Sequence, residues 1–174
     1  SILCGDVNPS GRTIDTFVYD LTQTPTANNF GNFTYTNMDE FKANAFGTDT
    51  IPAFVNYVEG IYVGYKFYET AAAEGLIDYD KTVVYPFGRG LSYTTFTQTL
   101  NSVTEADGTI TVDVTVTNTG SASGKEVVEV YYNPPYTNGG IEKASANLIG
   151  FAKTSELAPG ASENVTVTFK AEDM

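Results

Sequence analysis

The sequence contains no histidine and a single cysteine, Cys4, among its 174 residues. Histidine is the usual metal ligand and general base at neutral pH, so its absence excludes a Ser-His-Asp triad and leads us to expect no metal site. A lone cysteine cannot form an intrachain disulfide, and without a histidine partner it is a poor nucleophile.

Basic residues are also scarce, with 9 Lys and Arg against 21 Asp and Glu, which gives a formal net charge of −12. Nucleic acids and anionic membrane surfaces both require clustered cations, so we expect neither as a partner. No apolar run approaches the roughly 20 residues that span a bilayer. The composition leaves a cytoplasmic and a secreted location equally open.

Alternating polar and apolar residues dominate the later half of the chain. Residues 109–117 alternate polar and apolar side chains with the period of a half-buried strand. Residues 125–133 are β-branched and aromatic and predict the next strand, and residues 147–153 and 163–169 predict two more. Turn residues separate them and no helical pattern intervenes, which predicts a mainly β fold with an antiparallel sandwich of the fibronectin-III or immunoglobulin type. A seven-stranded sandwich needs more chain than this, so we expect the sandwich to be incomplete.

The earlier half is irregular and rich in aromatic residues. Residues 13–21 read as an extended piece and residues 22–37 as a loop. The single predicted helix covers residues 63–74, with Gly75 as its stop. Its apolar stripe is expected to consist of Tyr65, Phe67, Tyr68, Ala72 and Ala73. One helix cannot cover so many aromatics, so we expect this half to pack against another part of a larger protein.

Residues 57–65 place one carboxylate, Glu59, among aromatic side chains. Sugar sites need this mixture, because pyranose C–H faces stack on aromatic rings while carboxylates accept hydrogen bonds from hydroxyls. Glu59, Tyr57 and Tyr62 are therefore candidate substrate-binding residues. The alternative is a core aromatic cluster whose acid caps the start of the helix.

Two further motifs contain the only arginines of the chain. In residues 85–93, two glycines flank Arg89, which could clamp a carboxylate or hydroxyl of a ligand. The alternative is a tight connection in which Arg89 pairs with an acid across a boundary. Residues 5–12 lack the lysine of a phosphate-binding loop and predict a structural turn.

Taken in order, these three motifs resemble glycoside hydrolase family 3, the β-glucosidase and β-xylosidase family. They read GDVNPSGR at 5–12, YVEGIYVGYKFY at 57–68 and VVYPFGRGLSYTTF at 83–96. The resemblance implies that residues 1–92 are the C-terminal part of an α/β sandwich domain with its linker. Residues 93–174 would then form most of a fibronectin-III-like domain. Thr13 stands where the family commonly has leucine, and Arg89 where it often has histidine.

The resemblance also implies what lies elsewhere. The family's nucleophilic aspartate belongs to a (β/α) barrel and its acid/base glutamate lies before the first motif, so no catalytic residue is assigned to this chain. The parent enzyme is expected to hydrolyse β-linked sugars from the non-reducing end with retention and without a cofactor. The expected partners are the barrel and the rest of the sandwich domain of the same polypeptide. A free-standing carbohydrate-binding module and a structural spacer remain as alternatives.

Overall fold

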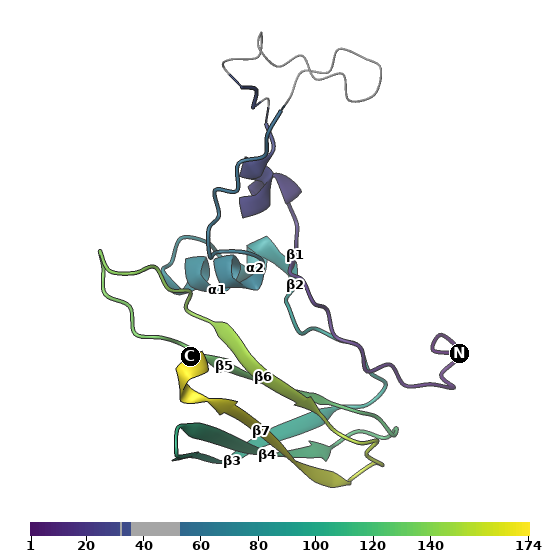
Figure 1. Ribbon diagram of the computed structural model, residues 1–174. Helices are drawn as coiled ribbons and strands as arrows, with labels where there is room; N and C mark the ends of the chain where they lie inside the picture. Colours follow the sequence, from purple (N-terminus) through teal and green to yellow (C-terminus); the bar gives the residue numbers. More distant parts are fainter. Residues whose placement is uncertain (32, 36–52) are drawn as a thin grey trace, which may run out of the picture.

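The computed structural model describes residues 1–31, 33–35 and 53–174. Two β-sheets lie face to face at one end, a helical layer lies beside them, and the N-terminal segment runs along one side (Figure 1). One sheet has three strands in the order β3-β4-β7, and the other consists of β5 and β6; every pair is antiparallel. The predicted antiparallel sandwich is therefore confirmed.

All four predicted strands are present. They are β4 (Thr109–Asn118), β5 (Val127–Tyr132), β6 (Asn147–Lys153) and β7 (Ser162–Lys170). Alternation places every second side chain of β4 and β7 between the sheets, where apolar burial stabilises the fold. The buried core consists of Val112, Val114, Val116, Val128, Leu157, Val165 and Val167.

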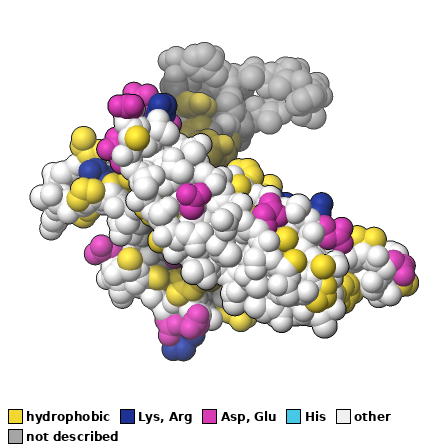
Figure 2. Space-filling model, turned by 90° about the horizontal axis from the view of Figure 1, so that it is seen from below, with side chains coloured by type: hydrophobic (Ala, Val, Ile, Leu, Met, Phe, Trp, Pro, Cys, Tyr) yellow, Lys and Arg dark blue, Asp and Glu magenta, His cyan; other side chains and the backbone are white. Residues whose placement is uncertain are grey.

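The opposite face of the three-stranded sheet carries hydroxyl and amide side chains that bond across the strands. Thr115 Oγ1 donates to Asn164 Oδ1 at 2.8 Å, and Thr166 Oγ1 donates to Asp113 Oδ1 at 2.6 Å. Seen from below, most of the surface is neither charged nor apolar (Figure 2). Cross-strand pairs of this kind stabilise a sheet modestly and keep its outer face polar.

The longest strand, β3 (Phe96–Ala106), was not predicted from the alternation. It pairs with β4 through a tight turn in which Asp107 has φ 50° and Gly108 has φ 70°. Positive φ at both central residues is the geometry of the hairpin turn that favours Asp-Gly. The Asp-Gly pair was thus a sequence signal for this hairpin.

Asn118 ends β4 and is fully buried. Its Oδ1 accepts hydrogen bonds from Thr94 Oγ1 at 2.6 Å and from Gly120 N at 3.1 Å. Its Nδ2 donates to the carbonyl oxygens of Ala122 and Leu157, both at 2.8 Å. One amide therefore satisfies the polar groups of three loops at this end of the sandwich.

The predicted helix forms as α1 (Tyr65–Ala73), two residues shorter at its start than expected. Its end is as predicted, because Gly75 adopts φ 70° and the Leu76 amide returns to the Ala71 carbonyl at 2.8 Å. The expected apolar stripe was partly wrong. Tyr68 is buried, but Ala71 is the second buried residue and Ala73 is exposed.

Helix α1 contacts the end of β5 and the start of β6. The Tyr65 hydroxyl accepts a hydrogen bond from Leu148 N at 2.9 Å, and its ring lies 5.9 Å from that of Tyr131. Thr70 Oγ1 accepts a hydrogen bond from Ser145 N at 3.0 Å. These contacts attach the helical layer to the sandwich.

The remaining elements are short. Among the described residues they are β1 (Phe17–Val18), β2 (Val83–Tyr85), α2 (Tyr79–Thr82) and the 3-10 helices η1 (Leu21–Gln23), η2 (Pro25–Asn29) and η4 (Ala171–Asp173). The extended piece predicted at 13–21 is a strand at only two residues, and the single-helix prediction missed α2. The loop predicted at 22–37 contains η1 and η2, while 32, 36 and 37 lie outside the described residues. No helix in the described ranges is long and apolar enough to cross a bilayer.

Candidate functional site: a joint built from the first and third motifs

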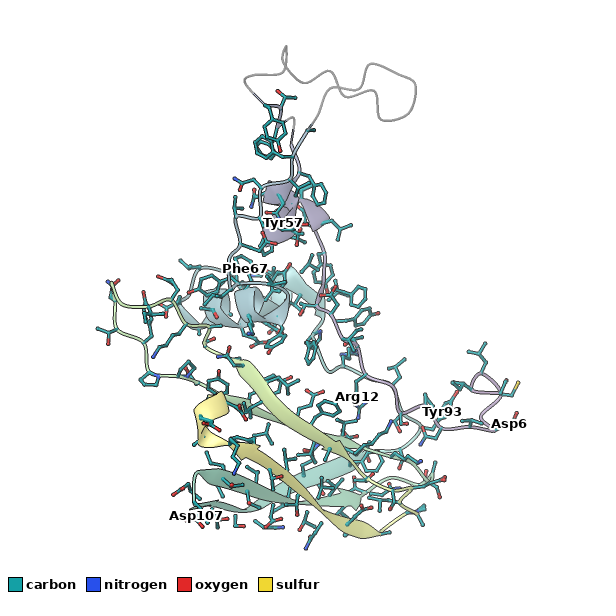
Figure 3. All side chains as sticks on the ribbon, in the orientation of Figure 1. Asp6, Arg12, Tyr57, Phe67, Tyr93 and Asp107 are labelled. Carbon is teal, nitrogen blue, oxygen red and sulfur yellow. The ribbon has the colours of Figure 1, made fainter. Side chains whose placement is uncertain are left out.

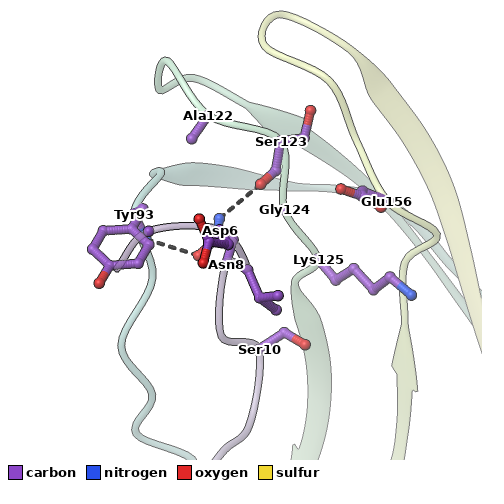
Figure 4. A pocket seen from close by; sticks show the side chains of 11 residues that line it. Asp6, Asn8, Ser10, Tyr93, Ala122, Ser123, Gly124, Lys125 and Glu156 are labelled. Carbon is purple, nitrogen blue, oxygen red and sulfur yellow. Dashed lines mark hydrogen bonds between the residues drawn. The ribbon is translucent and has the colours of Figure 1, made fainter. Parts of the chain in front are cut away.

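The first and third motifs meet at the side chain of Asn8. Its Oδ1 accepts hydrogen bonds from Tyr93 N at 2.9 Å and from Ser92 Oγ at 3.0 Å. Its Nδ2 donates to Ser123 O at 2.8 Å, on the connection between β4 and β5 (Figure 4). A Cβ on Gly124 would lie 2.6 Å from this nitrogen, so the close approach requires glycine. Asn8 therefore fastens the N-terminal segment to the sandwich.

Arg12, in the same motif, makes an ion pair of the kind that was one of the two interpretations of Arg89. One of its guanidinium nitrogens lies 2.6 Å from Glu126 Oε2, and the two side chains are 17% and 14% exposed. Gly90 leaves room for this guanidinium, because a Cβ there would lie 2.0 Å from it. The pair joins the first motif to the residue preceding β5.

Thr13 continues the joint as a short backbone pairing. Its amide donates to Arg89 O and its carbonyl accepts from Gly88 N, both at 2.8 Å. Its hydroxyl donates to Pro86 O at 2.7 Å and accepts from Arg89 N at 3.0 Å. The threonine that departs from the common family leucine thus supplies two hydrogen bonds across the joint.

Arg89 itself is exposed, and its guanidinium lies 5.1 Å from the centre of the Tyr85 ring, a cation–π contact. Within residues 1–31, 33–35 and 53–174 it forms no ion pair. The prediction that Arg89 pairs with an acid across the boundary was therefore wrong. Arg12 fills that role because its side chain points toward the start of β5.

A groove of about 610 Å³ lies where the N-terminal segment crosses the end of the sandwich (Figure 4). Asn8 and Tyr93 line it on one side, and Ser123, Lys125 and Glu156 on the other. The polar atoms of Asn8 are already hydrogen-bonded to neighbouring segments. The described contacts around this groove therefore fasten segments together.

The three candidate substrate-binding residues lie in the second motif, but their side chains have different surroundings. Tyr57 is 76% exposed, in the upper part of the molecule in Figure 3. Glu59 Oε1 accepts a hydrogen bond from Asn29 Nδ2 at 2.8 Å. The Tyr62 hydroxyl donates to Glu142 Oε2 at 2.5 Å, on the loop between β5 and β6. The described hydrogen bonds link none of these three side chains to one another.

Asn29 organises the surroundings of Glu59 and was not identified from the sequence. It is fully buried, and its Oδ1 accepts a hydrogen bond from Val58 N at 2.9 Å. Glu59 Oε2 is buried with no hydrogen-bond partner among the described residues. Helix α1 begins at Tyr65 with Gly64 as its N-cap and no side-chain cap, so Glu59 does not cap the helix. No sequence pattern distinguishes Asn29 from the other asparagines of its segment.

The hydrogen bond to the Glu142 carboxylate raises the pKa of Tyr62 to about 12, because the negative charge opposes ionisation of the phenol. We expect Glu142→Gln to lower this pKa toward its ordinary value of about 10. The measurement is a ¹³Cζ-tyrosine NMR titration, with the Tyr62 signal assigned from Tyr62→Phe. Glu105→Gln, at the turn between β3 and β4, should leave the Tyr62 titration unchanged. An unaltered pKa in Glu142→Gln would contradict the contact.

Comparison with known proteins gives one consistent result. Residues 126–174 match the fibronectin type III-like domain family. β-Glucosidase A of Butyrivibrio fibrisolvens is 37% identical over 99% of this chain, which spans 20% of that protein. The structure of β-glucosidase 3B from Thermotoga neapolitana in complex with glucose has a TM-score of 0.74 and 37% identity, with 99% of this chain and 21% of that one covered. The GH3 β-glucosidase of Bifidobacterium adolescentis has a TM-score of 0.72 and 30% identity, with 97% and 21% covered.

The resemblance to glycoside hydrolase family 3 is confirmed for this segment. The 174-residue chain, called here the family 3 segment, spans about a fifth of the length of the relatives it matches. The predicted fibronectin-III-like fold is likewise confirmed. The first and third of the motifs that resemble the family contain the residues of the joint. Asn8 and Arg12 contact the sandwich, and Gly90 leaves room for the Arg12 guanidinium.

Proposed function

We propose that the family 3 segment is a non-catalytic part of a larger β-glucosidase-like enzyme. The observation that carries this proposal is coverage, because relatives align with nearly all of this chain but extend several times beyond it. In this proposal, residues 1–92 complete an α/β sandwich domain and supply its linker, and residues 93–174 form most of the fibronectin-III-like domain. The catalytic aspartate and glutamate lie outside these residues.

The role of the segment is to brace the catalytic domains. Asn8, Arg12 and Thr13 hold its N-terminal part rigidly on the sandwich. Large apolar side chains on the same half are exposed in this structure: Ile14, Phe17, Tyr19, Leu21, Phe30 and Tyr57. Exposed apolar surface of this extent marks an interaction site. The barrel and the rest of the sandwich domain of the same polypeptide pack against this exposed apolar surface.

The second motif faces the substrate side of the parent enzyme. Tyr57 offers an exposed ring for stacking on a sugar, and Glu59, whose Oε2 is buried without a partner among the described residues, is the carboxylate of the same turn. Tyr62 is held by Glu142 and positions this turn. The substrate class is a β-glycoside cleaved from its non-reducing end, with retention through a glycosyl-enzyme formed elsewhere in the polypeptide.

We expect the isolated 174-residue chain to hydrolyse no aryl β-glucoside, and the longer polypeptide that carries it to do so. In the longer polypeptide, Glu59→Gln should raise KM for the glycoside about tenfold, since one hydrogen bond to a charged acceptor is weakened. Glu74→Gln, at the exposed end of α1, is the matched control. Turnover by the isolated chain that Glu59→Gln abolishes would refute the proposal. Saturable binding of a polysaccharide by the isolated chain would favour a carbohydrate-binding module.

A further inference from the structure

The second-motif turn, residues 57–62, is held at its first end from within the N-terminal half. Asn29 is fully buried, and its Nδ2 donates to Glu59 Oε1 at 2.8 Å while its Oδ1 accepts from the preceding backbone amide at 2.9 Å. Gly60 has φ 56°, and the Tyr62 amide donates to Glu59 O at 2.9 Å, which closes the turn. Tyr62 is therefore the second end of a segment whose first end is fixed.

That second end is held by the loop between β5 and β6, residues 133–146, which runs from the sandwich toward α1 (Figure 1). The Tyr62 hydroxyl donates to Glu142 Oε2 at 2.5 Å. The Tyr136 hydroxyl donates to the other oxygen of the same carboxylate at 3.4 Å. Among the described hydrogen bonds, the one between Tyr62 and Glu142 alone joins the second-motif turn to the sandwich.

The loop presents Glu142 from a fixed base. Ala144, two residues further along, is 2% exposed, and its carbonyl oxygen accepts a hydrogen bond from Asn147 Nδ2 at 2.8 Å. The next amide, that of Ser145, donates to Thr70 Oγ1 in α1 at 3.0 Å. The position of Glu142 is thus set by the sandwich and the helix together.

Side-chain packing does not fix the turn against the loop. A pocket of about 210 Å³ lies between them, with Ile61 on the side of the turn and Pro134 and Glu142 on the side of the loop. Ile61 is 46% exposed. A close-packed contact would resist displacement, but this open space does not. The hydrogen bond between Tyr62 and Glu142 therefore sets how the turn sits relative to the sandwich.

We propose that Glu142 is a positioning residue of the parent enzyme, through which the fibronectin-III-like domain holds the second-motif turn in the orientation that binds substrate. The inference rests on the proposed function, which places Tyr57 and Glu59 of this turn on the substrate side. Glu142 acts through the Tyr62 hydroxyl and touches no substrate itself. Displacing a binding group by about 1 Å weakens its contacts with a ligand, so loss of this bond should weaken substrate binding. The chemical step, which other parts of the polypeptide carry out, should be unchanged.

Steady-state hydrolysis of p-nitrophenyl β-glucoside by the longer polypeptide tests the proposal. Glu142→Ala and Tyr62→Phe should each raise KM roughly fivefold and leave kcat within about twofold, since one hydrogen bond is lost. The double variant should have the same KM as either single variant, because both substitutions remove the same bond. Glu142→Gln should keep a KM near that of the unaltered enzyme, since its amide oxygen still accepts from Tyr62. Asn138→Ala, on an exposed turn of the same loop, is the matched control and should change neither constant.

An unchanged KM in Glu142→Ala would overturn the inference, as would single-variant effects on KM that multiply in the double variant. A fall in kcat with KM unchanged would overturn it as well. In each of these cases, hydrolysis of the glucoside by the unaltered longer polypeptide would show that the proposed function still stands. A longer polypeptide that hydrolyses no β-glucoside would instead refute the proposed function, and the inference with it.

Discussion

Replacing Asn118 by alanine should lower the free energy of unfolding by about 3 kcal/mol, because buried polar groups then lose their partners. The substitution removes the acceptor of Thr94 Oγ1 and the donor to Ala122 O, and it leaves Leu157 O with the Gly124 amide alone. The measurement is urea unfolding of the 174-residue chain, followed by circular dichroism. We expect a lower midpoint with an unchanged slope.

Asn164→Ala is the matched control, since Asn164 lies on the exposed face of β7 and makes a cross-strand bond with Thr115. Its expected cost is within about 0.5 kcal/mol. If the two asparagine variants unfold at the same urea concentration, the buried network around Asn118 does not organise the loops as described.

Arg12→Met is expected to release the N-terminal segment from the sandwich at a cost of about 2 kcal/mol, because it leaves the largely buried Glu126 carboxylate without a countercharge. The segment should then be cleaved faster by a protease of broad specificity, with sites appearing within residues 1–16. Mass spectrometry of limited digests measures this directly. The double variant Arg12→Met with Glu126→Leu should recover part of the lost stability, since no charge is left unpaired.

The matched control for this pair is Lys81→Met. Lys81 pairs with Asp78 on the surface, where both side chains are mostly exposed, and such pairs contribute little. Cleavage of residues 1–16 at the same rate in Arg12→Met and the unaltered chain would show that the pair does not hold the segment.

The sandwich was predictable because its signal is local. β4 and β7 have polar and apolar residues at alternate positions, and the structure buries the apolar set. β3 was not predicted, for two reasons. Its inner face is largely uncovered, so a regular apolar pattern is not required there. A bulge between Leu100 and Ser102 also shifts its alternation. The Asp107-Gly108 turn was the usable clue.

The joint was predictable only in part, because its contacts link residues far apart in the chain. The motif that contains Asn8 and Arg12 was identified, but the turn predicted for it is wrong at residues 8–12, where the backbone forms no turn and the two side chains make the contacts. The choice between Arg12 and Arg89 as the partner of an acid depends on which side chain points toward β5, and no spacing in the sequence encodes that direction. Asn29 and Glu142 likewise act through contacts with distant residues.

The central claim is that this segment works as part of a larger enzyme, and the size of the natural polypeptide tests it most directly. An immunoblot of the source cells, with antibody raised against the 174-residue chain, should show a band several times larger than 18.7 kDa. Relatives that align with nearly all of this chain are about five times as long as it is, which sets that expectation. A single band at 18.7 kDa would contradict the account and favour a free-standing module.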